Sequence, residues 1–305
     1  MINKKGVCCI VLELEEQDPP LKFKTMTYKR FSSLPREEAL EKLGSVIVNN
    51  LTVTEAAIRY CGERGFAYRM SSDVFPLMTY DKAELMFHDF PQFEVIEKGL
   101  EKIKEAREAY DIRLSMHPDQ FNVLASDNKE AVSRTIKELY FHGWFMTRVG
   151  CPMSRKAPIN IHVNRSARTS DERKRVRDLL IENYMLLDDN VKTRLVLEND
   201  DKLSGWTVKQ LYDHFEFPIT FDYLHHKCHP GEGWASGERY AIGIAMDSWT
   251  YSKAVPLFHY SESIPGDKNP RKHADYASVL PDTYSNSFDL DFEFKMKEKS
   301  FAHLV

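Results

Sequence analysis

Short apolar runs alternate with longer stretches at helical spacing along almost the whole chain of 305 residues. Such alternation predicts parallel strands, each followed by a helix that crosses back over the sheet. The candidate strands are 6–12, 67–71, 112–117, 158–163, 193–198, 218–222, 255–259 and 288–293. The candidate helices are 36–64, 91–109, 129–149, 171–188, 206–214, 237–250 and 271–279.

This order of elements favours an α/β fold of the (β/α)₈ TIM-barrel type, with residues 1–305 as a single domain. A doubly wound parallel sheet is the alternative. Two segments, 13–35 and 223–236, are expected to be long loops. Because long loops at one face of a barrel often hold the substrate, both are candidate binding segments.

The overall charge does not identify a partner, since the net charge is −4 and the pI is about 6.3. Such a chain can still bind DNA through a local positive groove and bound cations. The 5 cysteines include no CxxC pair, which argues against a disulfide framework or a structural zinc site. No apolar run approaches the ~18 residues of a membrane helix, and the N-terminal one is too short for a signal peptide. We therefore expect a cytoplasmic protein without membrane association.

Histidine or carboxylate side chains end most of the candidate strands. In a TIM barrel the carboxyl ends of all strands meet at one rim, where active sites are built. Two further histidines follow closely, one three residues after the sixth strand and one after the seventh. The resulting candidate ligands are His117, His162, Glu198, Asp222, His225, His259, His273 and Glu293. Two neighbouring histidines, His226 and His229, stay unassigned.

The fifth candidate strand indicates what these side chains have in common. It runs into LVLENDDK (195–202), so an apolar segment leads directly to Glu198 and then to Asp200 and Asp201. Carboxylates this close repel one another unless they are solvated or cations lie among them. Imidazole and carboxylate at one rim are the ligand set of Zn²⁺, Mn²⁺ or Fe²⁺. We therefore predict that Glu198 ends a buried strand because it faces metal ions.

The number of candidate ligands predicts two or three divalent metals. Clustered metals suit phosphoester hydrolysis, because they lower the pKa of a water molecule and neutralise phosphoryl oxygens. A sugar isomerase or epimerase on the same barrel is the alternative enzyme, and it would use one or two metals. A non-catalytic binding protein is a third hypothesis, although binding alone does not need so many ligands.

Several segments together resemble ultraviolet-damage endonucleases, and the resemblance runs from about residue 40 to the end. The segments stand in the family's order: YRMSSDVFP (68–76), SMHPDQFNVLAS (115–126), INIHVN (159–164), LVLENDDK (195–202), FDYLHH (221–226), HADY (273–276) and DFEFKMKEK (291–299). The resemblance implies a TIM barrel related to endonuclease IV with up to three divalent metals. Mn²⁺ is the expected metal, and Zn²⁺ or Mg²⁺ are alternatives. The implied reaction is a nick in duplex DNA immediately 5′ to cyclobutane pyrimidine dimers or 6-4 photoproducts, leaving a 3′-hydroxyl and a 5′-phosphate.

The resemblance also implies roles for individual residues. All eight candidate ligands match ligand positions of the family, and we expect Glu198, His117, His259 and Glu293 to act in catalysis as well. The pair Gln120-Phe121 matches residues that probe the duplex at the lesion, where a wedge can hold the base stack open.

Three features depart from the family pattern. Tyr80 stands where relatives have a histidine ligand, so it is a possible metal or site residue. Leu257 stands where several relatives have a lysine near the metals, and the first strand lacks an expected aromatic residue and asparagine. These departures predict a weak or missing metal, or an altered lesion preference.

Binding of a damaged duplex also needs cations that contact phosphates, and we expect the protein to do this as a monomer associated with the nucleoid. The candidates follow strands and so share the rim with the metal ligands. They are Lys22, Lys24, Lys29 and Arg30 in the first long loop, Arg165 and Arg168 after the fourth strand, and Lys268, Arg271 and Lys272 after the seventh. The cluster Arg173, Lys174, Arg175 and Arg177 lies in a predicted helix, and we interpret it as a solvated face.

Overall fold

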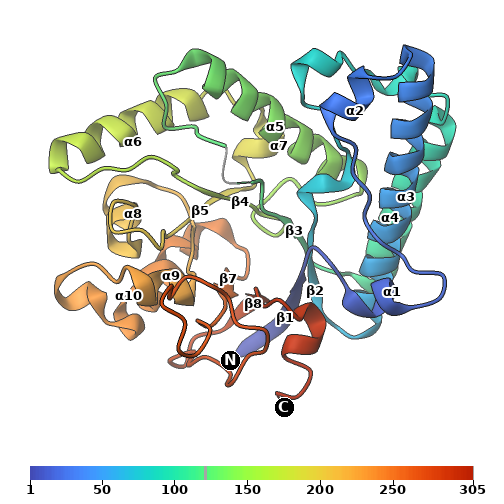
Figure 1. The fold of residues 1–305 in the computed structure, drawn as a ribbon. Coiled ribbons are helices and arrows are strands. Elements are labelled where there is room, and N and C mark those ends of the chain that lie inside the picture. The colour runs from blue at the N-terminus through green and yellow to red at the C-terminus, as the bar shows by residue number, and fades with distance from the viewer. Residues whose placement is uncertain (120–121, 305) are drawn as a thin grey trace.

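The computed structural model describes residues 1–119 and 122–304. Its centre is a sheet of 8 parallel strands in the order β6-β5-β4-β3-β2-β1-β8-β7, surrounded by helices (Figure 1). The strands are β1 (Ile2–Cys8), β2 (Ala67–Met70), β3 (Leu114–Met116), β4 (Ile159–His162), β5 (Leu195–Glu198), β6 (Ile219–Thr220), β7 (Leu257–Tyr260) and β8 (Phe288–Phe292).

The ring of strands closes between β6 and β7 through a short contact. The amide N–H of His259 donates to the carbonyl of Phe221 at 2.9 Å, and Asp222 forms a parallel bridge with His259. β1 lies between β2 and β8, so the first and last strands pair in parallel. The predicted (β/α)₈ TIM barrel is confirmed.

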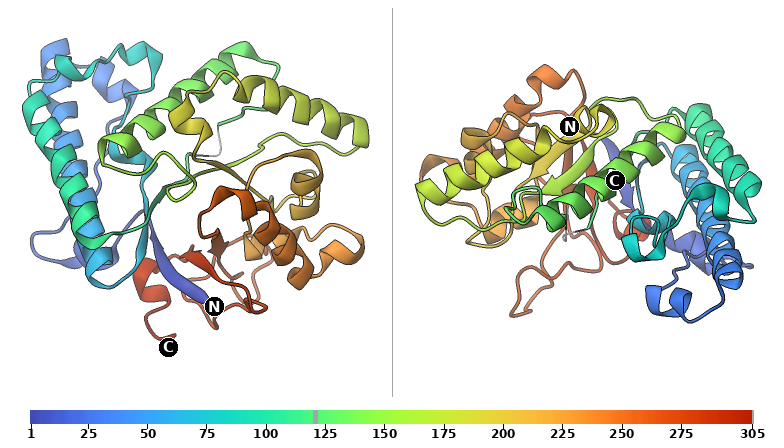
Figure 2. Two further views of the ribbon diagram at one scale, coloured as in Figure 1. Left: turned by 180° about the vertical axis from the view of Figure 1, so that it is seen from behind. Right: turned by 90° about the horizontal axis from the view of Figure 1, so that it is seen from above.

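The outer layer consists mainly of helices (Figure 2). They are α1 (Leu12–Glu16), α2 (Tyr28–Ser32), α3 (Arg36–Glu63), α4 (Phe93–Tyr110), α5 (Lys129–Arg148), α6 (Ser170–Tyr184), α7 (Asp189–Lys192), α8 (Val208–His214), α9 (Tyr223–Cys228) and α10 (Glu238–Ser248). In this described part of the chain, no helix is long and apolar enough to cross a membrane.

Local sequence signals account for where several helices begin. Asn128 caps α5, because its side chain accepts hydrogen bonds from the first-turn amides. Thr169 and Glu172 form a reciprocal capping box at α6, as Thr207 and Gln210 do at α8. α6 and α8 follow the loops that leave β4 and β5, so these caps fix the course of the chain just beyond the rim.

Three sequence predictions differ from the structure. The first strand ends at Cys8 rather than at residue 12, because Cys9 adopts a positive φ of 66° and its N–H bonds to the carbonyl of Arg69 at 2.8 Å. The segments 13–35 and 223–236 contain short helices rather than loop alone. The predicted helix over 271–279 is wrong: Ala274 N–H bonds to the carbonyl of Glu262 at 2.7 Å, so this segment pairs with the preceding chain instead.

One glycine allows a buried carboxylate into the barrel. A Cβ atom on Gly6 of β1 would lie 1.9 Å from Oδ1 of Asp291 on the neighbouring β8. Asp291 is fully buried, and its Oδ2 lies 3.9 Å from Nε2 of His259. Only glycine at this position leaves room for Asp291 to reach toward the candidate ligands.

Candidate metal centre

Glu198 is the centre of the predicted site. It is the last residue of β5 and only 1% exposed. Nε2 of His117 and Nδ1 of His259 each lie 3.1 Å from its Oε2. Nδ1 of His225 lies 3.2 Å and Nε2 of His162 lies 3.7 Å from its other oxygen, Oε1. Each carboxylate oxygen therefore faces two histidines.

Three groups of side chains present ligand atoms within 4.8 Å of one another. Two of them share Glu198, and the third shares His259 with the first. The groups are His117–Glu198–His259, His162–Glu198–His225 and Asp222–His259–Glu293. Seven of the eight predicted ligands thus come together at the carboxyl ends of six strands.

The buried atoms of these groups fit cations. Oδ2 of Asp222 is buried and has no hydrogen-bond partner among the described residues. Oδ1 of the same carboxylate accepts the N–H of His225 at 2.6 Å. An unpartnered carboxylate oxygen costs free energy when it is buried, unless a cation lies beside it. The donor set of imidazole nitrogens and carboxylate oxygens suits Mn²⁺ or Zn²⁺.

The electrostatics of the centre are strongly coupled. Burial would raise the pKa of Glu198, but the charges of His259 and His162 hold it well below its usual range. Burial would lower the pKa of His259, but the carboxylates of Glu198 and Glu293 raise it to about 9. Without metal, protons on the histidines therefore balance the carboxylates, and a metal must displace these protons to bind.

For Asp222 and His117, burial outweighs the neighbouring charges in setting the pKa. Burial is the main reason why the pKa of Asp222 is raised, and Glu198 adds to the increase. Burial also lowers the pKa of His117, although the hydrogen bond to Glu198 opposes this. A low pKa keeps the His117 imidazole neutral, the form in which it can bind a metal.

His273 is the eighth predicted ligand and lies apart from the three groups. Its Nδ1 lies 2.6 Å from the carbonyl oxygen of Glu293 and donates to it. Together with Cys8, Arg69 and Glu293 it lines a cavity of about 290 Å³. This places His273 beside the centre, in contact with the backbone of a candidate ligand.

Several polar residues of the site escaped the sequence prediction. Asn160 donates to Oε2 of Glu198, and Arg69 forms a buried ion pair with Glu293. Asp200 holds His162 through a 3.2 Å contact between Oδ1 and Nδ1. Alternation along a strand could have identified one of them, because residues two apart point to the same face. Asn160 lies two residues before His162 in β4 and therefore points to the same face.

The remaining predicted site residues vary in their surroundings. Tyr80 is 42% exposed, and its ring centroid lies 4.8 Å from that of Tyr28, outside the three groups. Leu257 is buried in the apolar core at the start of β7. Gln120 and Phe121, the predicted lesion probe, lie outside the described residues.

Four of the nine predicted phosphate contacts already pair with carboxylates. The shortest distances are 3.9 Å for Lys22–Glu15, 3.2 Å for Arg165–Asp127, 3.3 Å for Arg271–Asp201 and 3.0 Å for Lys272–Asp267. The backbone of Lys24 is held by the side chain of Asn50. Exposed ion pairs contribute little, about 0–1 kcal/mol, so a phosphate could replace these carboxylates.

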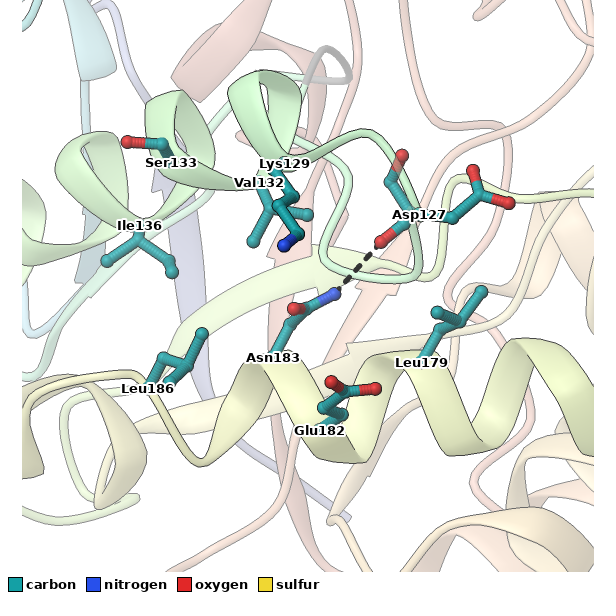
Figure 3. A pocket seen from close by; sticks show the side chains of 10 residues that line it. Asp127, Lys129, Val132, Ser133, Ile136, Leu179, Glu182, Asn183 and Leu186 are labelled. Carbon is teal, nitrogen blue, oxygen red and sulfur yellow. Dashed lines mark hydrogen bonds between the residues drawn. The ribbon is translucent and has the colours of Figure 1, made fainter.

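Cavity size does not mark the metal centre. A cavity of about 630 Å³ lies between α5 and α6 (Figure 3). Asn183 lines it and donates to the carbonyl of Ser126 at 3.1 Å. None of the predicted ligands lines this cavity. The buried charges, rather than the open volume, identify the candidate site.

A known protein family matches nearly the whole chain. The family model of UV-endonuclease UvdE matches residues 3–305. The chain belongs to this family. A UV DNA damage endonuclease of Nostoc sp. is 30% identical over 309 residues, covering 98% of this chain and 88% of the relative.

Solved structures give the same result for the fold. The crystal structure of SacUVDE has a TM-score of 0.77 and 27% identity, covering 97% of this chain and 94% of that one. The 3-keto-D-glucoside 4-epimerase of E. coli has a TM-score of 0.50 and 13% identity, covering 79% of this chain and 86% of that one. The epimerase likeness concerns the fold alone, whereas the family match rests on the sequence and spans residues 3–305.

Proposed function

We propose that the protein is a metal-dependent endonuclease that nicks damaged duplex DNA immediately 5′ to UV photoproducts. The family supports a UV-damage endonuclease. The observation that carries the chemistry is Glu198, whose two oxygens each face two histidines and which belongs to two of the three ligand groups. A carboxylate in this position would help to hold a cation in each of these two groups.

The seven clustered ligands would hold two or three divalent metals, with Mn²⁺ as the first candidate. Such metals would supply a water nucleophile of low pKa and neutralise phosphoryl oxygens during phosphodiester hydrolysis. The protein's own contribution is orientation. Asn160 and Asp200 fix Glu198 and His162, and Arg69 fixes Glu293.

We propose that His273 supports the metal centre from beside it. It holds the backbone carbonyl of Glu293, and we propose that it either orients this ligand or completes its metal site. Gln120 and Phe121 are proposed to probe the lesion, as the family resemblance implies. We further propose that residues 1–305 act as a single barrel domain and as a monomer.

The test is a nicking assay on an end-labelled duplex with one cyclobutane thymine dimer. Mn²⁺ should give a cut immediately 5′ to the dimer, and a chelator should abolish it. The undamaged duplex is the control for lesion dependence. No cut at a dimer, a 6-4 photoproduct or an abasic site, together with metal-dependent turnover of a ketose, would replace this proposal by the epimerase hypothesis.

A further inference from the structure

A second polar cavity lies on the rim side of the barrel, outside the ligand groups. Its volume is about 450 Å³, and we call it the rim cavity. Arg168, Arg173, Thr207 and His229 are among its lining residues, which come from the segments that follow β4, β5 and β6. These segments also carry His225 and Asp200 of the candidate centre, so both sites share one framework.

Two arginines give the rim cavity its charge. Within the part of the chain that the structure describes, neither Arg168 nor Arg173 has a carboxylate within 4.0 Å of its side-chain nitrogens. Nη1 of Arg173 is buried without a hydrogen-bond partner among these residues, and the guanidinium lies 5.2 Å from the centroid of Trp206. Burial lowers the pKa of Arg173, because a desolvated cation lacks the stabilisation that water or an anion provides.

The neighbours of Arg173 on α6 behave differently. Nζ of Lys174 lies 3.9 Å from Asp171, and a guanidinium nitrogen of Arg175 lies 2.9 Å from Asp127. These two cations form the solvated face that the sequence predicted. For Arg173 that prediction is wrong, because its guanidinium packs over Trp206 and lines the rim cavity.

The other lining residues leave the balance positive. Lys209 is already paired with Asp213 at 2.6 Å, so its charge is largely neutralised. Glu232 is the carboxylate among the lining residues. His229 is 7% exposed, and its Nδ1 has no hydrogen-bond partner among the described residues. Among the described lining residues, two guanidinium groups without an ion-pair partner and an unpartnered imidazole nitrogen thus meet one carboxylate, and the nearby Glu172 of α6 offsets only part of this charge.

We propose that the rim cavity binds a backbone phosphate of the DNA strand, distinct from the phosphate that is cleaved. Guanidinium groups recognise phosphate oxygens through paired hydrogen bonds, and the rim position puts the site on the face that the duplex must approach. None of the lining residues belongs to the three ligand groups. The cavity therefore positions the duplex, and this assignment rests on the proposed function.

Binding of duplex DNA in the presence of a chelator tests the site without requiring catalysis. Arg173→Met removes the charge but keeps an aliphatic side chain over Trp206, and Arg168→Ala removes the exposed second arginine. Lys174→Met is the matched control, because it removes the same charge from the adjacent, solvated position. Loss of one phosphate contact should weaken binding about tenfold and make the slope of log K against log salt shallower by about 0.9.

Nicking of the dimer-containing duplex provides the second measurement. The arginine variants should raise KM while leaving kcat within about twofold, because the interaction is the same in the ground and transition states. Lys174→Met should match the wild type in both assays. If Arg173→Met unfolds at a lower temperature, Arg168→Ala decides the result, because its exposed side chain packs against less of the protein.

The outcomes separate the two proposals. If the wild type binds and nicks the duplex but both arginine variants retain its affinity and salt slope, the rim cavity proposal fails and the proposed function stands. If the wild type binds the duplex without nicking it, the proposed function fails, while weaker binding by the arginine variants still supports the cavity. A wild type that does not bind duplex DNA overturns both.

Discussion

The two ends of the barrel hold buried charges in different ways. At the amino end, Arg113 donates to Oδ2 of Asp289 at 2.7 Å, and Oδ1 of the same carboxylate accepts the N–H of Lys4 at 3.1 Å. At the carboxyl end, Asp222 has a buried oxygen without a partner among the described residues, and Glu198 is surrounded by histidines. The Arg113–Asp289 pair is complete by itself, whereas the carboxylates at the carboxyl end require protons or cations from solution.

This difference shows how one architecture separates stability from chemistry. A buried ion pair whose hydrogen bonds are all made needs no further ligand, and removing one partner destabilises the fold. A carboxylate cluster that needs external cations couples the fold to a ligand. Substitutions at both ends therefore test whether stability and catalysis depend on separate residues.

Glu198→Gln should have the largest effect on activity. Removing the shared carboxylate should lower nicking at least about a thousandfold, because the metals contribute several kcal/mol to catalysis. Stability without metal should change by less than about 2 kcal/mol, since the nearby histidines can release their protons. Nicking rate and thermal unfolding of the chelated protein measure the two effects. Near-normal nicking would contradict the role of Glu198.

Asp289→Asn should reverse this pattern. The substitution leaves Arg113 without its carboxylate partner at a site where the two side chains are 10% and 6% exposed. We expect a loss of about 2 kcal/mol in the free energy of unfolding. Nicking per folded molecule should stay within about twofold of the wild type. A large loss of kcat at full folding would show that the amino end takes part in catalysis.

The pattern of strands and their polar ends was sufficient to predict the barrel and most of the side chains that cluster at its carboxyl end. Alternating apolar runs determine a parallel sheet, and a parallel sheet brings its carboxyl ends together. The sequence could not reveal the segment 271–279, whose helix-like composition gives way to pairing with Glu262 and its neighbours. Tertiary pairing of this kind depends on distant residues rather than on local propensity.

The supporting residues were harder to predict for a different reason. The sequence does not distinguish Asp200 from the other acidic residues of LVLENDDK, and only the structure shows its contact with His162. Arg173 is one of several cations on α6, and only Trp206 distinguishes it from Lys174. The sequence predicts the same solvated environment for all of these residues, whereas their packing partners decide which of them are desolvated.

The stability of the metal-free protein should depend on pH through the carboxyl end. His259 has a pKa of about 9, above the usual value of about 6.5 for an unfolded histidine. Its proton therefore stabilises the fold fully below pH ~6.5, and this contribution is lost as the pH rises through about 9. Urea midpoints of the chelated protein should fall between pH 7 and pH 9.

Two variants locate the source of this pH dependence. His259→Gln should reduce the fall in urea midpoint, because one histidine with a raised pKa is absent, while His162 and His225, whose pKa values the nearby carboxylates also raise, remain. Asp289→Asn should lower the midpoint at every pH and keep the wild-type slope, since the amino-end pair contains no histidine. Equal slopes in the wild type and His259→Gln would assign the pH dependence to other groups.

Tyr80→Phe should have the smallest effect, because the tyrosine lies outside both charge systems. Its ring packs beside Tyr28 with a centroid distance of 4.8 Å, and 42% of the residue is exposed. Phenylalanine keeps the ring contact and removes only the hydroxyl, so nicking and Mn²⁺ affinity should stay within about twofold. A tenfold loss of Mn²⁺ affinity would instead mean that the segment around Tyr80 moves to bring the phenol to the metals. In that case the carboxyl end depends on residues beyond the strand ends, and its difference from the self-contained Arg113–Asp289 pair becomes larger.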